Sequence, residues 1–345
     1  MIVDYSPLDG MQFNCLDDCG LCCTYQPELM RQEHRFYKTN KLTKTGIVAG
    51  NIGNSDKNNT MSFNLQNTIG ACTFLKNKKC QIYDIRPLKC RTFPINIYFG
   101  WRIQLYFNMS CRGLWNENKS NNLHSLGEEL FFGLHKHTVR QLFDISRKQY
   151  QSLQIHLKTY IPPDELRTEI LKKVKNFQID PYENYKDAEV NFKFSLQHEE
   201  FKDLPIHLAE DLKWHIFKLE NDTIQRIQLE ENGFFNTKDS INISNVGIKP
   251  ISANAMKLIT NYIQTVAERD HFIGIVYQRS LAGCNEPLID SAIDTLKIIS
   301  TLTIINSSML AEFHSREEID DKVIKEGISL TDGHVSILPS IGSIM

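Results

Sequence analysis

Net charge, long apolar runs and the short motifs of common enzymes are all scarce in this sequence. Among its 345 residues, 39 Lys and Arg nearly balance 41 Asp and Glu, which gives a net charge of −2. Because the charges are so evenly balanced, the sequence gives no global electrostatic reason to expect binding to nucleic acid or to a membrane surface. Neither Gly-x-Gly-x-x-Gly nor Gly-x-Ser-x-Gly occurs, so neither a Rossmann dinucleotide site nor an α/β-hydrolase nucleophile is supported.

The most apolar run covers residues 298–311 and is flanked by Lys297 and Glu312. It is shorter than the roughly 20 residues that a membrane-spanning helix needs, so it predicts a buried helix. The first 15 residues include Asp4 and Asp9 and contain neither a basic segment nor an apolar stretch. We therefore expect no secretory signal and a cytoplasmic protein without a membrane segment.

Cysteine is what the sequence does have, and its distribution is uneven. Of nine cysteines, eight lie between Cys15 and Cys111, and only Cys284 lies outside that region. In a reducing compartment, a dense set of cysteines favours metal binding or catalysis over disulfides. Residue Cys284, in a turn expected between two long helices, is interpreted as a structural or a reactive thiol.

The spacing of the eight cysteines predicts a metal centre. It reads Cys15-x3-Cys19-x2-Cys22-Cys23, then 48 residues, then Cys72-x7-Cys80-x9-Cys90-x20-Cys111. Gly20 permits a bend that lets the thiolates of Cys19 and Cys22 converge on one ion. Because neighbouring side chains diverge, we expect Cys22 and Cys23 to serve different centres or different edges of one cluster. Eight thiols suit two four-ligand sites, or one cluster with additional sulfurs nearby.

The local charge fits a site that carries negative charge. Residues 1–115 hold 14 Lys and Arg against 8 Asp and Glu, so this part is +6 and the remainder is −8. Cations beside Cys90 and Cys111 would stabilise thiolates there, although each is also explained as a solvated surface charge. These cations are Arg86, Lys89, Arg91 and Arg112.

The same spacing bears on the identity of the metal. Zinc sites usually have paired C-x2-4-C knuckles in both halves, whereas here only the first half has one. The ferredoxin run of three closely spaced cysteines is absent as well. This mixture of close and distant cysteines favours an iron–sulfur cluster over zinc, and both remain open.

The cysteines and their neighbours resemble a known family. The pattern is Phe13-x-Cys15-x3-Cys19-Gly20-x-Cys22-Cys23, followed by Cys72-Thr73-Phe74-Leu75-x4-Cys80-x-Ile82-Tyr83-x2-Arg86-Pro87-x2-Cys90-Arg91-x-Phe93-Pro94. Over about residues 12–115 it resembles the YkgJ-type cysteine-cluster family, whose CxxCxxCC domain chelates zinc or iron. Two departures are the x3 spacing after Cys15, where many members have x2, and a polar insertion over residues 41–67.

The resemblance implies metal or iron–sulfur binding by Cys15, Cys19, Cys22, Cys23, Cys72, Cys80, Cys90 and Cys111, and no defined reaction. Flagellin lysine N-methylases are similar in the same cysteine pattern, which makes a protein lysine N-methyltransferase the alternative. That alternative requires S-adenosylmethionine, for which the sequence shows no pocket, and a protein substrate. A second alternative is a zinc-stabilised scaffold that binds a protein partner. Catalytic residues are not identified.

Apolar periodicity predicts an α+β fold in which an irregular, metal-organised N-terminal module precedes helices and a mixed helix and hairpin region. The expected domains are residues 1–115, 116–180 and 181–345. We expect helices over residues 123–178, with one starting at Pro162-Pro163, and two long helices over residues 252–279 and 287–313. Alternation predicts a strand over residues 190–196, and Asn221-Asp222 predicts a hairpin turn between residues 214–219 and 223–229. Residues 333–345 are expected to form a short strand or coil.

Overall fold

A computed structural model describes residues 2–24, 28–30, 33–49, 61–67, 70–116, 121–197, 204–283 and 286–345. Cys284 and residues 50–60 of the polar insertion lie outside the described residues. The chain packs as two compact units, and each is built from separate stretches of sequence. Unit 1 comprises Met1–Asn14, Pro94–Leu196 and Ile241–Met345, and unit 2 comprises Cys15–Phe93 and Gln197–Ser240.

Unit 1 is mainly helical, and its described residues also form a four-stranded mixed sheet and a separate two-stranded antiparallel sheet. Its helices are α3 (Leu123–Phe132), α4 (Lys136–His156), α5 (Pro163–Val174), α6 (Tyr185–Leu196), α7 (Ala253–Glu268), α8 (Asp270–Leu281), α9 (Leu288–Phe313) and α10 (Asp321–Val335). Its strands are β1 (Val3–Asp4), β2 (Gln12–Phe13), β8 (Ile95–Phe99), β9 (Ile103–Phe107), β10 (Asn121–Asn122) and β15 (Ser343–Ile344). The four-stranded sheet has the order β1-β9-β8-β15, with β1 parallel to β9 and the other pairs antiparallel.

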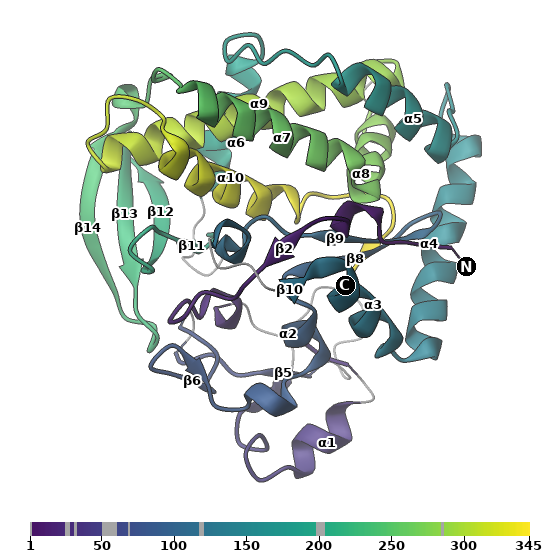
Figure 1. The fold of residues 1–345 in the computed structure, drawn as a ribbon, viewed down its shortest axis with the longest axis vertical. Helices are drawn as coiled ribbons and strands as arrows, with labels where there is room; N and C mark the ends of the chain where they lie inside the picture. The colour runs from purple at the N-terminus through teal and green to yellow at the C-terminus, as the bar shows by residue number, and fades with distance from the viewer. Residues whose placement is uncertain are drawn as a thin grey trace. The chain divides into compact units, whose positions relative to one another are not determined.

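The core of unit 1 lies where α7, α9 and α10 pack side by side (Figure 1). Every residue of α9 from Ile299 to Ala311 is buried, which confirms the buried helix predicted from the apolar run. Three of its buried hydroxyl groups, those of Ser300, Thr303 and Ser307, donate to backbone carbonyls within the helix, at 2.8, 2.8 and 2.7 Å. Helix α10 begins at the Asp320 cap, whose carboxylate accepts two backbone N–H bonds at 2.9 Å each.

The predicted helix over residues 252–279 is in fact two helices, with the break at Arg269. This residue adopts an extended conformation (φ −78°, ψ 128°) between α7 and α8, and its side chain is buried. Its guanidinium pairs with Asp332 (Nη1 to Oδ1, 2.5 Å) and donates to the Phe107 carbonyl at 3.0 Å. The apolar periodicity continues through this position, so the sequence pattern did not indicate a break that long-range partners create.

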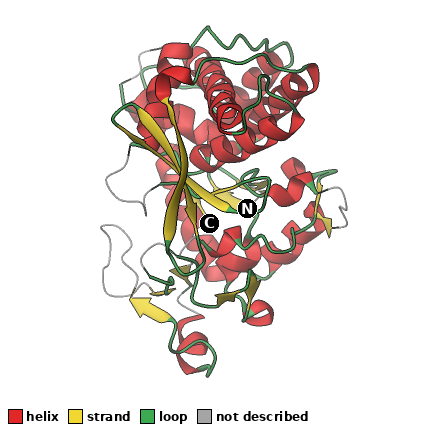
Figure 2. Cartoon of the chain, turned by 90° about the vertical axis from the view of Figure 1, so that its left-hand side faces the viewer, coloured by secondary structure: helices red, strands yellow, loops and turns green. Residues whose placement is uncertain are grey.

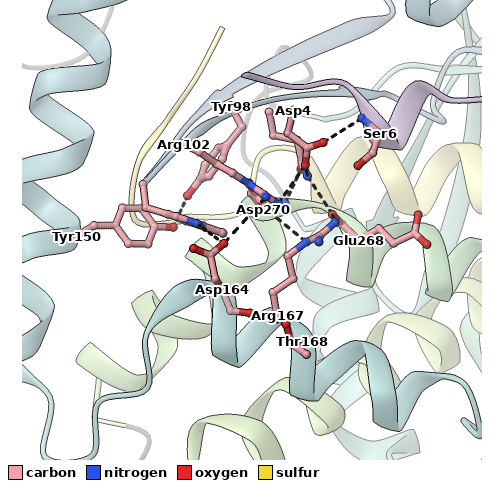
Figure 3. A network of polar contacts seen from close by, with 12 residues as sticks. Asp4, Ser6, Tyr98, Arg102, Tyr150, Asp164, Arg167, Thr168, Glu268 and Asp270 are labelled. Carbon is pink, nitrogen blue, oxygen red and sulfur yellow. Dashed lines mark hydrogen bonds and ion pairs between the residues drawn. The ribbon is translucent and has the colours of Figure 1, made fainter. Parts of the chain in front are cut away.

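A network of charged groups follows directly after that break (Figure 3). Buried Asp270 accepts two hydrogen bonds from Arg102, at 2.6 and 2.9 Å, and Arg167 Nε lies 3.4 Å from its Oδ1. Arg102 also pairs with Asp4 at 3.0 Å. The network therefore links β1, the loop before β9, α5 and α8, and each buried charge in it faces an opposite charge.

The predicted strand over residues 190–196 is wrong, because these residues form the last part of α6. Phe192 and Leu196 are buried four residues apart on one helix face, and Ala188 extends that face by a turn. Val190 and Phe194 lie on the exposed side. Two apolar residues outside the core thus produced an alternation that a strand would also show.

Unit 2 is built from short elements and one longer sheet. Its helices are α1 (His34–Thr39) and α2 (Leu88–Thr92), and its strands are β3 (Glu28–Leu29), β4 (Ile47–Ala49), β5 (Met61–Phe63), β6 (Leu75–Lys76), β7 (Lys79–Cys80), β11 (His207–Leu208), β12 (Trp214–Glu220), β13 (Thr223–Leu229) and β14 (Phe235–Asn242, its last two residues counted with unit 1). The longer sheet has the order β11-β12-β13-β14, and Figure 2 shows the twist of its strands. Asn221 and Asp222 have φ angles of 47° and 62°, which confirms the predicted hairpin turn.

These elements confirm the α+β class. Helices α3, α4 and α5 occupy the region predicted to be helical, and α5 starts at Pro163 as expected. Helix α10 was not predicted, and it covers Gly333, where a strand or coil was expected.

None of the helices in the described ranges is both long enough and apolar enough to cross a membrane. The boundaries after residues 115 and 180 stay a prediction about domains, while packing groups the chain into the two units above.

Candidate metal site in the cysteine-rich unit

The first half of the site is the turn that carries Cys19, Cys22 and Cys23. Gly20 adopts the left-handed conformation at φ 59°, as its place in the Cys-x-x-Cys turn predicts, and a short 3-10 helix covers Leu21–Cys23. The turn is closed by the Cys23 N–H, which donates to the Gly20 carbonyl at 2.9 Å. The Leu21 N–H points to Cys19 Sγ at 3.5 Å, so backbone amide dipoles already face that sulfur.

A backbone hydrogen bond joins this turn to the second half of the motif. The Cys72 N–H donates to the Cys23 carbonyl at 2.7 Å, across the 48 intervening residues. From Cys72 the chain enters the β6–β7 hairpin, where Cys80 is paired in register with Leu75. Three cysteines far apart in sequence are thereby held in one region of unit 2.

Apolar packing buries the cysteines from two sides. One cluster of buried residues contacts Cys19 and Cys23, and it consists of Leu21, Ala71, Leu75, Leu204, Leu208, Trp214, Ile216, Ile227 and Leu229. The other includes Cys72 and contacts Cys23 and Cys80, and its other members are Leu29, Tyr37, Phe63 and Ile82. Cys23 contacts both clusters, so it lies between the two small cores of the unit.

The thiols of unit 2 act on one another electrostatically as a single group. Burial raises the pKa of Cys19 and of Cys72 to about 11 each, and it also raises the pKa of Cys15, Cys80 and Cys90. A negative charge on Cys22 adds to this shift at every one of the six other thiols, namely Cys15, Cys19, Cys23, Cys72, Cys80 and Cys90. Cys22 is therefore the common neighbour of the whole group.

The side chains of Cys22 and Cys23 lie close enough to interact through a hydrogen bond, and the prediction that they serve different centres or different edges of one cluster stays open. The bond lowers the pKa of Cys22 and raises the pKa of Cys23. Cys23 therefore keeps its proton, and its S–H donates the hydrogen bond to the Cys22 sulfur. The tight 3-10 turn allows this contact between consecutive residues. The two thiols thus belong to one group of sulfurs.

Two cations face the thiols. Arg86 lowers the pKa of Cys15, Cys22, Cys80 and Cys90. Its Nε donates to the Tyr83 carbonyl at 3.1 Å, and its guanidinium lies 3.7 Å from the centre of the Tyr83 ring. The predicted role of Arg86 as a cationic neighbour of the thiols is confirmed, whereas Lys78, whose charge acts on Cys19, was missed.

Cys111 lies in unit 1, unlike the other seven cysteines. It follows β9 in a loop that is fixed to α10, because the Met109 N–H donates to Asp332 at 2.6 Å and Arg112 pairs with Glu326 at 2.9 Å. The positive charge of Arg112 is thus matched by a buried carboxylate. The role of Cys111 as a ligand stays a prediction.

The donor set fits zinc or iron in its chemistry. All eight cysteines from Cys15 to Cys111 are free thiols, and soft thiolates are the ligands that zinc and iron–sulfur centres use. In the part of the chain that the structure describes, no three His, Cys, Asp or Glu side chains are arranged to hold an ion as they stand. Thiols bind a metal as thiolates, so metal binding would release protons from them.

Sequence reasoning missed the contribution of residues 204–233 to this site. These residues supply Trp214, Leu208 and Ile216 to the core beneath Cys19 and Cys23. The Glu231 carbonyl accepts a hydrogen bond from the Ala71 N–H at 2.8 Å, one residue before Cys72. The hairpin was recognisable from its turn, but no local signal indicates what a hairpin packs against.

Comparison with known proteins agrees with the chemistry of this unit. Residues 14–119 match a family model named CxxCxxCC, described as "Putative zinc- or iron-chelating domain". An "Uncharacterized protein MJ0661" of Methanocaldococcus jannaschii is 30% identical over 121 residues, which covers 31% of this chain and 61% of that protein. No solved structure matches. The comparison confirms the predicted resemblance, so residues 14–119 of this chain are similar to zinc- or iron-chelating CxxCxxCC domains.

Proposed function

We propose that unit 2 binds a metal centre through its thiols, with an iron–sulfur cluster as the preferred occupant and zinc as the alternative. The expected ligands come from Cys15, Cys19, Cys22, Cys23, Cys72, Cys80 and Cys90. The observation that carries the proposal is the 2.7 Å hydrogen bond from the Cys72 N–H to the Cys23 carbonyl, which joins the Cys19–Cys23 turn to the hairpin that carries Cys80. A cytosolic, reducing environment is part of the proposal, since the thiols must remain free.

The single group of thiols favours one polynuclear centre over two distant ions. Two separate tetrahedral sites would divide the cysteines into two sets with little mutual influence. Here the thiols share one neighbour, so deprotonating several of them concentrates negative charge in one place. A zinc ion and the core of an oxidised four-iron cluster each carry a charge of +2, so either would offset part of that negative charge.

The residues of the chain itself have two tasks in this function. The thiols bind the centre, and the two apolar clusters exclude water from one side of it. An iron–sulfur cluster would supply electron transfer, whereas zinc would stabilise a surface for a protein partner. Neither the described residues nor the comparisons provide support for S-adenosylmethionine, so methyl transfer is not proposed.

Anaerobic purification followed by metal and sulfide analysis tests the proposal. We expect a brown protein that contains iron and acid-labile sulfide. A colourless protein that contains zinc would replace the iron–sulfur proposal with the alternative, and a protein that binds neither metal after reconstitution would overturn both.

Two serine variants sharpen this test. Cys22→Ser removes the common neighbour of the thiols, so we expect it to abolish metal binding. Cys111→Ser tests the eighth predicted ligand: a normal metal content in this variant would restrict the ligands to the seven cysteines of unit 2, and a loss of metal would add Cys111 to them. Full metal content in Cys22→Ser would contradict the central position of Cys22.

A further inference from the structure

The Trp214 side chain packs against the turn that carries Cys19. Its side chain is fully buried, and its indole Nε1–H donates to the Cys19 carbonyl at 2.8 Å. A Cβ atom added at Gly20 would lie 3.0 Å from Cζ2 of the same ring, so the turn rests directly against the indole. The position of the ring therefore fixes the direction of the backbone that carries the Cys19 sulfur.

Lys78 lies on the face of the same ring. Its Nζ is 3.1 Å from the ring centre of Trp214, which is a close cation–π contact. Lys78 occupies the β6–β7 turn in the left-handed conformation (φ 58°), and its backbone N–H donates to the Glu231 carboxylate. The turn, the carboxylate and the indole together fix where the ammonium group is placed.

The placement of this cation has an electrostatic consequence for the site. The Lys78 side chain also reaches the turn that carries Cys19, because a Cβ atom added at Gly20 would lie 3.4 Å from the Lys78 Cδ. An apolar side chain would cover the indole without the cost of removing an ammonium group from water. The Glu231 carboxylate supplies the nearest negative charge for this half-buried lysine, and ionised thiols of the Cys19 turn would add to it.

We propose that Trp214 and Lys78 are positioning residues of the metal centre: Trp214 sets the geometry of the Cys19 turn, and Lys78 supplies positive charge beside that turn. The proposal rests on the proposed function of unit 2. It assigns a role to a hairpin more than 100 residues beyond the last cysteine of the unit. The residues beyond the resemblance thus contribute to the chemistry of the site.

Substitutions at Lys78 test the electrostatic part. In the full-length protein, affinity for Zn²⁺ is measured by competition with a chelator, and Co²⁺ provides absorption bands that report thiolate coordination. We expect Lys78→Gln to lower Zn²⁺ affinity by about 10-fold or more, as residues just outside a ligand set often do. Lys78→Arg keeps the charge and the ring contact, so it should retain affinity. Lys76→Gln removes a cation from the exposed end of the same hairpin and is the matched control.

Substitutions at Trp214 test the geometric part. Trp214→Phe keeps an aromatic ring but loses the hydrogen bond to Cys19, so we expect altered Co²⁺ absorption bands and weaker binding. Trp101→Phe is the control, because it also removes an indole hydrogen bond, here the 2.9 Å bond to Asp164 in unit 1. Circular dichroism at a saturating Zn²⁺ concentration checks that each variant still folds.

The outcomes separate this inference from the function on which it rests. If the unaltered protein binds neither Zn²⁺ nor Co²⁺, both the proposed function and the inference fail. If it binds them and Lys78→Gln behaves like Lys76→Gln, the charge role of Lys78 is overturned while the metal site stands. Unchanged Co²⁺ bands in Trp214→Phe would overturn the geometric role, and should that variant not fold, the Lys78 series still decides the inference.

Discussion

The two units of this protein reach stability by different means. Unit 1 buries long helices, and in α9 an unbroken stretch from Ile299 to Ala311 is out of contact with water. Unit 2 has two helices of five and six residues in its described part, and most of its strands are two or three residues long. Short elements bury little apolar surface, so the second unit depends more on hydrogen bonds between its turns and on its thiols.

The two units also differ in how their buried charges are neutralised. In unit 1, Arg269 and Asp332 are both buried and neutralise each other. In unit 2, seven thiols that carry negative charge when ionised face mainly Arg86 and Lys78. An excess of one sign in a small core is unfavourable unless a cation is added, which is the role that a metal fills.

Removal of the metal is expected to have the largest effect, and to affect only one unit. Structural zinc contributes about 10–16 kcal/mol of apparent binding free energy in small domains, which is more than the usual stability of a domain. Treatment with a chelator should therefore abolish the protection of backbone amides in unit 2, as measured by hydrogen exchange and mass spectrometry. Helices α7, α9 and α10 provide the internal control and should keep their protection. Equal loss of protection in both units would contradict the contrast drawn here.

Acid is expected to act on unit 1 through His271. This histidine is buried, and burial together with the charge of Arg269 lowers its pKa to about 4 from 6.5. The rings of Tyr98 and Tyr106 lie 5.7 and 6.2 Å from its ring, and the Leu338 backbone bonds to it and partly opposes the shift. The unfolded chain binds the proton first, so stability is complete above pH 6.5 and falls by about 3 kcal/mol as the pH decreases to 4.

Urea denaturation between pH 6.5 and pH 4 measures the predicted loss of stability. The helical circular dichroism signal reports on unit 1, because that unit contains the long helices. His271→Phe keeps a ring between the two tyrosines and cannot be protonated, so its stability should vary less between pH 6.5 and 4. A variant with the same pH dependence as the unaltered protein would assign the effect to other groups.

Two glycines give the smallest and most closely matched comparison. Gly10 in unit 1 and Gly20 in unit 2 both have left-handed φ angles, at 70° and 59°. A Cβ atom at Gly10 would meet nothing within 4 Å, whereas at Gly20 it would crowd Trp214 and Leu75. Gly10→Ala should cost about 1–2 kcal/mol from backbone strain, and Gly20→Ala at least about 1 kcal/mol more from crowding. Denaturation of both variants measures the two losses of stability, and the metal content of Gly20→Ala is measured as well. Equal losses in the two variants would contradict the crowding and show that the Trp214 indole moves aside freely.

The parts of the fold that the sequence predicted are those with local causes. Asn221 and Asp222 tolerate the left-handed conformation, so the hairpin turn was readable. Pro163 suits the first turn of α5, and Gly20 provides the bend between Cys19 and Cys22. Each of these features depends on residues within a few positions of one another.

The parts that were missed have long-range causes. The chain breaks at Arg269 because its guanidinium reaches Asp332 and the Phe107 carbonyl, both more than 60 residues away. Similarly, nothing near Trp214 indicates that its indole supports a turn almost 200 residues earlier. The cysteines of the candidate site were readable as a set, whereas their grouping around Cys22 depends on the turns that bring the two halves together.

The discontinuous make-up of unit 2 has a consequence for biosynthesis. Its first segment ends at Phe93, but Trp214 and Glu231, which hold the cysteine turns, are translated much later. At 5–20 residues per second, the ribosome needs about 10–30 s to reach the end of the second segment. During that interval the seven thiols are exposed on an incomplete unit, so metal incorporation into the finished site follows synthesis of nearly 240 residues.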